Sequence, residues 1–381
     1  MPEIAATGAA EEWELLQPAH VARVELKNRI VMSAMTRGRT PGGIQGDLNV
    51  DYYTQRTGAG LIMGESSSIS PTALGFSPNN PRIYTEEHAA GWKRVTDAVH
   101  ARGTRMFLQL WHCGRNSHPS MQPDGAMPFG PSATPPSPDI KIRPGGLPPV
   151  TPRELDVSEI PALLEDYRNA ARRAMEAGFD AVEVHAGNGY LLDQFLRNCT
   201  NKRTDAYGGS PANRARLLFQ VTEAVCEVWG EDRVGVRISP VNRAGYGMHD
   251  SDPQSLFTCV VDGLHAIGIG FLDVVEGETT ESAVPPEFDY DELRSRFRGI
   301  YIANNLYTFA KGNEAVRRGH ADLVAFGRPF VSNPDLVDRF KLGAPLSEMR
   351  RESYTGKGSL GYTDYPALEP PAMEPGPQSP G

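Results

Sequence analysis

Three side chains with complementary chemistry follow one short apolar run of this sequence. Residues 181–184 read Ala-Val-Glu-Val, and His185, Asn188 and Tyr190 come directly after them. A His and an Asn three residues apart can donate hydrogen bonds to one ligand oxygen. A Tyr beside them has a proton to give, because its ordinary pKa is about 10. The set would suit reduction of a double bond conjugated to a carbonyl or nitro group. The alternative is a capped strand end with a structural His.

A second group of polar residues lies inside, or at the end of, other apolar runs. Arg237 lies inside Val-Gly-Val-Arg-Ile, Gln109 lies inside Phe-Leu-Gln-Leu-Trp, and Thr36 follows the first run. A buried cation needs an anion. For Arg237 that anion is either a carboxylate, which would be structural, or the pyrimidine edge of a flavin, which is negative when reduced. Gln109 and Thr36 could hydrogen-bond the same ring.

Eight short apolar runs, most of them followed by an amphipathic segment, must position these residues. Short runs rich in Val, Ile and Leu are typical of buried parallel strands, and residues 158–177 and 212–229 carry apolar residues at helical spacing. The repeated strand–helix unit predicts an α/β fold, a single (β/α)8 TIM barrel. A doubly wound sheet is disfavoured because no G-x-G-x-x-G turn follows the first strand. The predicted strands are 29–33, 60–63, 106–110, 181–184, 234–238, 271–275, 299–302 and 323–326.

Polar residues follow nearly every predicted strand, and such barrels place their active sites at this face. Asn304-Asn305 follows the seventh run and Gly327-Arg328 follows the eighth. The loops after strands seven and eight often bind a phosphate in these barrels. Backbone approach at a Gly and the forked charge of an Arg suit that ligand. We therefore expect a phosphorylated cofactor at this end.

Two segments depart from the strand–helix pattern. Residues 116–153, between the third and fourth strands, hold many Pro and Gly residues and predict a long structureless loop, which is either a lid or a passive surface excursion. Residues 1–368 are expected to form one cofactor-binding barrel domain. The Pro-rich tail 369–381 is expected to be disordered.

The composition excludes several classes of partner. The formal net charge is −9, from 38 Lys and Arg against 47 Asp and Glu, which argues against nucleic acid and an anionic membrane. No apolar stretch reaches the roughly 20 residues that cross a bilayer, and the N-terminus lacks the features of a signal peptide. The four cysteines are scattered, without metal-ligand spacing. We expect a cytoplasmic protein without metal, monomeric or homodimeric, whose partners are small molecules.

Several stretches of the sequence resemble one enzyme family. They carry most of the polar residues above and span nearly the whole chain, from about residue 13 to residue 368. The chain resembles the Old Yellow Enzyme family of FMN-dependent ene-reductases, and is especially similar to its N-ethylmaleimide reductase and pentaerythritol tetranitrate reductase branch. The matching stretches are 26–37, 59–65, 109–115, 185–190, 201–209, 324–328 and 361–366.

The resemblance implies a flavin enzyme with two half-reactions. Non-covalently bound FMN would be reduced by NADPH or NADH and would then reduce activated alkenes: enones, enals, maleimides and nitroalkenes, with nitrate esters as a further class. His185 and Asn188 would bind the activating oxygen of the substrate, and Tyr190 would donate the proton. The substrate cavity would be walled by Phe76, Trp111 and Tyr362. The implied FMN contacts are Ala34, Met35, Thr36, Ser66, Gln109, Arg237, Asn304, Asn305, Gly327 and Arg328.

Four positions depart from the family pattern, and two other functions stay open. Ala34 stands where much of the family has Pro, Phe76 where relatives often have Tyr, and Asn304-Asn305 in place of a Gly-rich turn. One alternative is a catalytically silent flavin- or steroid-binding barrel of the same fold. The other is a flavin-free barrel lyase, which would want a Schiff-base Lys or a metal cluster at the strand ends.

Overall fold

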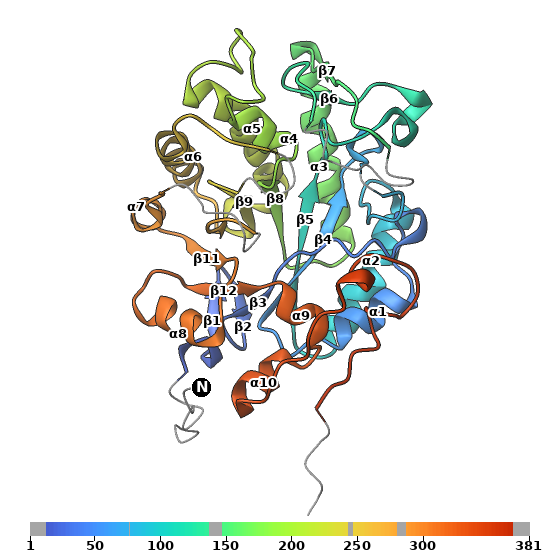
Figure 1. Cartoon of the computed structure of the whole chain (residues 1–381), viewed down its shortest axis with the longest axis vertical. Coiled ribbons are helices and arrows are strands. Elements are labelled where there is room, and N and C mark those ends of the chain that lie inside the picture. The colour runs from blue at the N-terminus through green and yellow to red at the C-terminus, as the bar shows by residue number, and fades with distance from the viewer. Residues whose placement is uncertain (1–12, 76, 137–146, 243–246, 280–286, 369–381) are drawn as a thin grey trace, which may run out of the picture.

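Eight parallel strands close into a barrel at the centre of the molecule (Figure 1). The structure is a computed structural model, and it describes residues 13–75, 77–136, 147–242, 247–279 and 287–368. Around the barrel the strands follow chain order and β12 pairs with β3, which confirms the predicted (β/α)8 TIM barrel. The barrel strands are β3 (Ile30–Met32), β4 (Leu61–Ser68), β5 (Arg105–Trp111), β8 (Ala181–Ala186), β9 (Val234–Ile238), β10 (Phe271–Val275), β11 (Ile300–Asn304) and β12 (Leu323–Phe326).

Helices return the chain from the end of each strand to the start of the next and cover the outside of the barrel (Figure 1). The two segments with helical spacing, 158–177 and 212–229, are helical, as predicted. None of the helices in the described part of the chain is long and apolar enough to span a membrane. The helices are α1 (Asp47–Thr54), α2 (Glu86–His100), α3 (Ile160–Glu176), α4 (Leu191–Leu196), α5 (Pro211–Trp229), α6 (Pro253–Ile267), α7 (Tyr290–Arg296), α8 (Phe309–Arg317), α9 (Arg328–Ser332) and α10 (Leu336–Leu342).

Alternation along the strands divides the apolar core in two. In β8, Val182 and Val184 belong to the large cluster between the barrel and the helices, whereas Ala181 belongs to a smaller cluster inside the barrel. The interior cluster also holds Phe107 and Phe271, whose ring centroids are 5.3 Å apart. Because successive side chains of a strand point to opposite faces, the next inward position after Ala181 is residue 183.

An N-terminal hairpin closes the lower end of the barrel, and the apolar-run analysis did not predict it. Strands β1 (Ala19–Val21) and β2 (Val24–Leu26) pair antiparallel. Val21 and Leu26 are buried in the interior cluster. The hairpin therefore shields the apolar end of the barrel interior from water, and the polar end faces the opposite way.

The excursion between β5 and β8 is not structureless, so that part of the prediction is wrong. Two short 3-10 helices and a parallel pair of two-residue strands, β6 (Phe129–Gly130) and β7 (Arg153–Glu154), form within its described part. Asn116 Nδ2 donates to the Gly189 carbonyl over 2.8 Å, so the start of the excursion contacts the 187–190 loop. Local backbone pairing gives this Pro-rich segment its order without a helical period. The predicted disordered tail, 369–381, lies outside the described residues.

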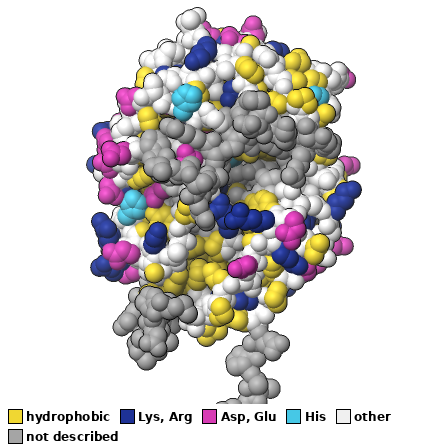
Figure 2. Space-filling view, in the orientation of Figure 1, with side chains coloured by type: hydrophobic (Ala, Val, Ile, Leu, Met, Phe, Trp, Pro, Cys, Tyr) yellow, Lys and Arg dark blue, Asp and Glu magenta, His cyan; other side chains and the backbone are white. Residues whose placement is uncertain are grey.

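Charged side chains of both signs are interspersed over the face seen in Figure 2. On this face neither sign gathers into one extended field, such as a nucleic-acid backbone would need.

Candidate active site

A layer of polar side chains lies inside the barrel, above the apolar interior cluster. Strand alternation turns Gln109, Glu183, Arg237, Asp273 and Asn304 inward, since their strand neighbours belong to the outer core. Gln109 Nε2 donates to Glu183 Oε1 over 2.6 Å, and Asn304 Nδ2 donates to Asp273 Oδ1 over 3.0 Å. These polar groups form one connected network rather than separate buried defects.

Arg237 has a carboxylate partner, yet one of its donors is left over. Its Nη1 lies 3.9 Å from Asp273 Oδ2 and donates to Ser33 Oγ over 3.2 Å. Arg237 Nε is buried and makes no hydrogen bond with any described residue. A buried unpaired donor costs about 1–3 kcal/mol. Asp273 and Ser33 therefore account for part of the hydrogen-bonding capacity of the Arg237 guanidinium, and the Nε donor remains for a ligand.

Glu183 and Asp273 are site residues that the sequence analysis missed. Their side chains are fully buried beside the single cation Arg237. Burial, with the neighbouring Asp273 charge, raises the pKa of Glu183 to about 8, and burial raises the pKa of Asp273 as well. The signal was present in the sequence, since each is a lone charged residue in an apolar run, as Arg237 is.

The loop after β8 brings together the three residues that opened the sequence analysis. His185 is the last inward residue of β8 and stands in register with Arg237 on β9. Asn188 has φ 55°, in the left-handed region that Asn tolerates better than most residues. Tyr190 directly precedes α4, and its ring centroid lies 5.1 Å from that of His185. A strand end, a left-handed turn and a helix start thus set the spacing of the triad.

Neighbouring side chains fix the orientation of the loop. The backbone N–H of Asn188 donates to Ser239 Oγ over 2.7 Å, and Asn188 Oδ1 accepts from Asn242 Nδ2 over 3.0 Å. Trp111 packs edge to face on Tyr190, with ring centroids 5.1 Å apart and planes at 90°. Because the Asn188 oxygen is held by Asn242, its NH2 group remains to donate to a ligand.

His185 is neutral in this environment. Burial first, and then the positive charge of Arg237, hold its pKa well below the ordinary value. Its Nδ1 is buried and has no hydrogen-bond partner among the described residues. A neutral imidazole carries one N–H and one acceptor nitrogen, so His185 can still donate a hydrogen bond to a ligand oxygen without carrying charge.

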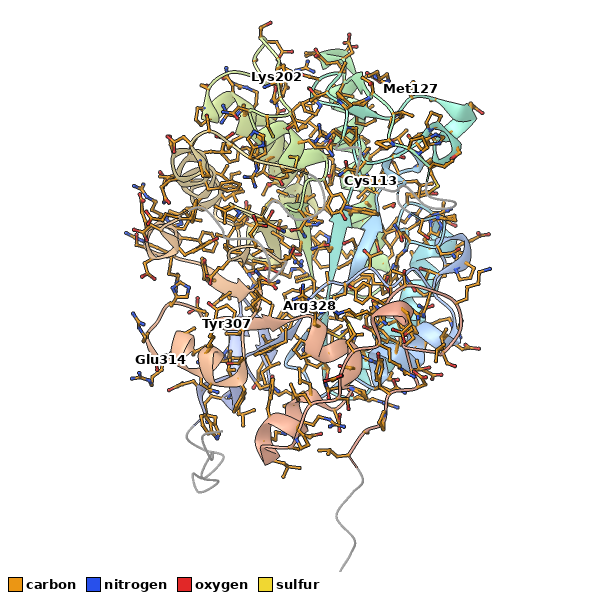
Figure 3. All side chains as sticks on the ribbon, in the orientation of Figure 1. Cys113, Met127, Lys202, Tyr307, Glu314 and Arg328 are labelled. Carbon is orange, nitrogen blue, oxygen red and sulfur yellow. The ribbon has the colours of Figure 1, made fainter. Side chains whose placement is uncertain are left out.

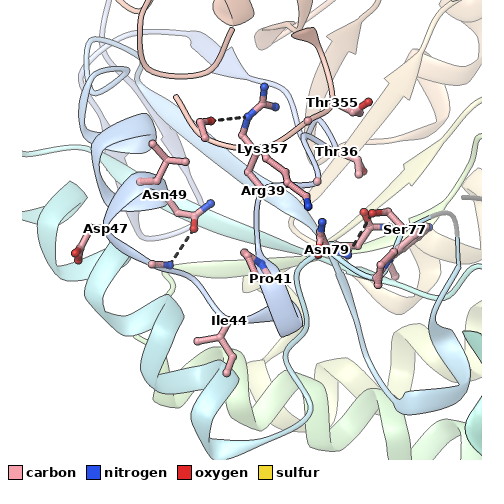
Figure 4. Close-up of a pocket in the computed structure, with 18 of the residues that line it drawn as sticks. Thr36, Arg39, Pro41, Ile44, Asp47, Asn49, Ser77, Asn79, Thr355 and Lys357 are labelled. Carbon is pink, nitrogen blue, oxygen red and sulfur yellow. Dashed lines mark hydrogen bonds between the residues drawn. The ribbon is translucent and has the colours of Figure 1, made fainter. Parts of the chain in front are cut away.

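A cavity of about 1120 Å³ opens at the carboxyl end of the barrel, large enough for a drug-sized ligand (Figure 4). Of the predicted residues, Thr36, Trp111 and Tyr190 line it. The rest of its wall comes from the segments 38–49, 77–80 and 355–358.

Other predicted cofactor contacts surround this end of the barrel. Ser66 Oγ donates to Gln109 Oε1, which ties the end of β4 to the interior network. Ala34 and Met35 are half-buried beyond β3. A side chain at Gly327 would meet Met35 Sδ at 3.5 Å, so the ends of β3 and β12 lie next to each other.

The predicted phosphate end is arranged differently from the simplest expectation. The Asn304 side chain points into the barrel, toward Asp273. Asn305 Nδ2 donates to the carbonyls of Glu276 and Glu278, at 2.8 and 2.7 Å. Arg328 is exposed at the start of α9 and donates to the Thr279 carbonyl (Figure 3). Of the predicted phosphate residues with side-chain donors, Arg328 is therefore the one whose side chain is exposed.

Of two further predicted cavity residues, Tyr362 does not line the cavity directly, and the other cannot be placed. Tyr362 is fully buried, stacks on Tyr52 with ring centroids 4.0 Å apart, and accepts a hydrogen bond from Asn49 Nδ2 over 3.0 Å. Since Asn49 itself lines the cavity, Tyr362 supports the wall from behind. Phe76 lies outside the described residues.

Comparisons with known proteins give one consistent result. Residues 14–347 match the NADH:flavin oxidoreductase / NADH oxidase family. The chain is 43% identical to 12-oxophytodienoate reductase 7 of Oryza sativa subsp. japonica, over 94% of this chain and 95% of that protein. It is 40% identical to 12-oxophytodienoate reductase 2 of Arabidopsis thaliana, over 95% and 97%.

Solved structures agree in fold as well as in sequence. Morphinone reductase in complex with tetrahydroNAD superposes with a TM-score of 0.87 at 43% identity, covering 93% of this chain and 98% of that one. The Old Yellow Enzyme homologue from Zymomonas mobilis superposes with a TM-score of 0.89 at 39% identity, covering 93% and 100%.

Proposed function

Since this chain belongs to the NADH:flavin oxidoreductase / NADH oxidase family, that of the Old Yellow Enzymes, and is an FMN-dependent oxidoreductase, we propose that it reduces carbon–carbon double bonds activated by a carbonyl or nitro group. The substrates in this proposal are enones, enals, maleimides and nitroalkenes, taken in ping-pong order after a nicotinamide. The observation that carries it is the meeting of two hydrogen-bond donors and a phenol, His185, Asn188 and Tyr190, at the mouth of the barrel.

The polar end of the barrel fits a flavin ring. Arg237 Nε and His185 Nδ1 are buried and have no hydrogen-bond partner in the described part of the chain, and a planar ligand with polar edges would satisfy such atoms. Gln109 is held by Glu183 and Ser66, so its remaining N–H and lone pair have fixed directions. We assign the ring to Thr36, Gln109 and Arg237, and the phosphate to Arg328 and the backbone at Gly327. FMN, when bound, supplies hydride exchange between a nicotinamide and an acceptor.

His185 and Asn188 hold the activating oxygen of the substrate in this mechanism. Neutral His185 donates one hydrogen bond and the Asn188 amide donates another, which draws electron density from the double bond toward the oxygen. Neither donor depends on a change of charge near neutral pH. The pair therefore makes the β-carbon electrophilic and fixes the alkene in one orientation.

Tyr190 donates the proton that completes the saturated product. Its half-buried phenol lies beside His185 and lines the cavity. The edge-to-face contact with Trp111 limits rotation of the Tyr190 ring, so the hydroxyl keeps one direction relative to the bound oxygen. A general acid placed in this way contributes about 10²–10⁴-fold to a rate.

A comparison of half-reactions tests the proposal. The purified protein should show flavin absorbance that bleaches with NADPH and returns with cyclohexenone under anaerobic conditions. In stopped-flow measurements, Tyr190→Phe should slow reoxidation by cyclohexenone about 10²–10⁴-fold and leave reduction by NADPH unchanged. The control is Tyr207→Phe, whose hydroxyl bonds Gln220 away from the cavity. Equal slowing of both half-reactions by Tyr190→Phe would exclude the proton-donor role.

The two alternatives from the sequence have different standing. The flavin-free lyase is set aside, because the family is flavin-dependent. A silent flavin or steroid binder of the same fold would bind FMN but would not consume NADPH steadily with cyclohexenone. Steady-state NADPH consumption with cyclohexenone therefore separates such a binder from the proposed reductase.

A further inference from the structure

Two buried carboxyls meet inside the barrel, in register with two of the residues that we assign to the flavin ring: Glu183 is level with Gln109, and Asp273 is level with Arg237. Glu183 is 0% and Asp273 1% exposed, and their carboxyls are within hydrogen-bonding reach of each other. Glu183 Oε1 accepts from Gln109, whereas Glu183 Oε2 accepts no N–H or O–H donor from the described residues. Glu183 Oε2, the oxygen without a donor, therefore lies on the carboxyl that faces Asp273.

A count of charges shows that one proton is needed. Arg237 is the one cation that faces this pair among the described residues, at 3.9 Å from Asp273. With both carboxyls ionised the buried group would carry a net charge of −1, in a medium where an unpaired charge is very costly. With one proton the group is neutral: Glu183 donates to Asp273, and Asp273 pairs with Arg237 and Asn304.

The surroundings of Glu183 offer no other charge. On the strand before it, Gln109 of β5 faces it, and on the strands after it Arg237 of β9 and Asp273 of β10 face it. Two residues farther along β8 is His185, which is neutral. Ser33, which directly follows β3, and Asn304 of β11 complete the network with uncharged groups.

We propose that Glu183 and Asp273 together hold a single proton that keeps the barrel interior neutral beside the flavin, and that flavin reduction is coupled to the return of this proton wherever the pair has lost it. Hydride from the nicotinamide brings two electrons and one proton to the ring, so the ring gains one negative charge. Where the pair has lost its proton, reduction draws one proton from solvent back to Glu183. The proposal rests on the ring position given under the proposed function, and Glu183 acts in it as a positioning residue through Gln109 and Asp273.

Two physical arguments support this coupling. Glu183 is linked to two of the three assigned ring contacts, to Gln109 directly and to Arg237 through Asp273, so a change of charge on the ring acts on the pair at short range. Burial and the Asp273 charge raise the pKa of Glu183 to about 8, so its proton is held at neutral pH and lost as the pH rises above about 8.

The midpoint potential of bound FMN, measured from pH 6 to pH 10, tests the proposal without any turnover. In the wild-type protein the potential should fall more steeply above about pH 8, by the equivalent of one additional proton per two electrons. Glu183→Gln keeps the size and both hydrogen bonds but cannot lose a proton. Its curve should coincide with wild type at pH 6–7 and lie above it at pH 10.

Controls separate this inference from the proposed function. Asp166→Asn replaces a half-buried carboxyl on α3, outside the barrel, and should reproduce the wild-type curve. If Glu183→Gln does not retain FMN, Asp273→Asn serves instead: Glu183 would then pair with Arg237, and the break in slope should move to lower pH. Parallel curves for the wild type and the Glu183 or Asp273 variant would overturn the proton coupling. Failure to reduce cyclohexenone would overturn the proposed function and leave the potential measurement valid.

Discussion

Arg197 Nε donates to Asp193 Oδ1 over 2.6 Å, and the two side chains are 1% and 0% exposed beneath the 187–190 loop. Asp193 Oδ2 accepts from the Gly189 N–H over 2.8 Å, and Arg197 Nη2 donates to the Ser239 carbonyl over 2.6 Å. This ion pair, between Asp193 of α4 and Arg197 at the end of that helix, therefore joins the 187–190 loop to the residue that follows β9. The geometry of the triad depends on a pair that contacts no substrate.

Breaking this pair on one side should be strongly destabilising. Asp193→Ala leaves the Arg197 charge buried without its carboxylate, and we expect a loss of about 3–5 kcal/mol in the free energy of unfolding, measured in urea. The double variant Asp193→Leu/Arg197→Met removes both charges and should recover most of that loss. A single variant that loses less than about 1 kcal/mol would contradict the assignment.

His185 should make the stability of the fold sensitive to acid. Its pKa is held well below the ordinary value of about 6.5, so below that pH the unfolded chain binds a proton that the folded chain does not. The free energy of unfolding should therefore fall as the pH drops below about 6.5. His185→Asn should reduce this loss by about 2 kcal/mol at pH 5. The exposed His249→Asn is the control, and an unchanged acid limb in His185→Asn would refute the prediction.

The order of the barrel could be predicted from the sequence because short Val- and Leu-rich runs repeat between amphipathic segments. All eight predicted runs are barrel strands. The lengths of the strands were less predictable than their order. Strand β4 continues to Ser68 through Gly64 and Glu65, with an irregular register between Gly64 and Ser67. Apolar periodicity gives no signal for a strand built from small and polar residues. The β1–β2 hairpin was not predicted for a similar reason, since three-residue strands are too short to show a clear apolar periodicity.

Candidate site residues could be predicted where a chemically suitable side chain follows a predicted strand. They were harder to predict where the inward or outward direction of a strand residue determines what its side chain contacts. Ile302 points into the barrel, so Asn304, two residues later, points there as well, and its side chain is used by Asp273. Applying that alternation to the sequence would have redirected the Asn304 prediction. The place of Tyr362 could not be found in this way, because it depends on stacking with Tyr52, far away in the chain.

Asn242 should matter for substrate binding although it lies outside the predicted triad. Its amide holds Asn188 Oδ1 at 3.0 Å, which leaves the Asn188 NH2 group for the substrate oxygen. Asn242→Ala releases that orientation, and a lost hydrogen bond of about 1 kcal/mol should raise the KM for cyclohexenone about fivefold. The rate of flavin reduction by NADPH should not change. An equal rise in the KM for cyclohexenone and in the KM for NADPH would argue for a general structural effect.

His320 should stabilise the fold at neutral pH and cease to do so in alkali. Its hydrogen bond from Nε2 to Glu276 Oε1, at 2.8 Å, is the main cause that raises its pKa to about 9, and Asp291 adds to it. A raised pKa stabilises the folded state fully below about pH 6.5 and loses that effect as the pH rises through about 9. His320→Gln should therefore cost about 2 kcal/mol of unfolding free energy at pH 6.5, after allowance for partial exposure, and almost nothing at pH 10.

His320→Gln should also weaken the binding of FMN at the carboxyl end of the barrel. Glu276 also accepts from the Tyr307 hydroxyl over 2.6 Å, and its backbone carbonyl accepts from Asn305 Nδ2 over 2.8 Å. Loss of the His320 charge loosens the anchor of the Asn305 turn, so FMN should dissociate several-fold more readily from His320→Gln at pH 6.5, measured by quenching of flavin fluorescence. An equal loss of stability at pH 6.5 and pH 10 would show that His320 acts by packing and not through its charge.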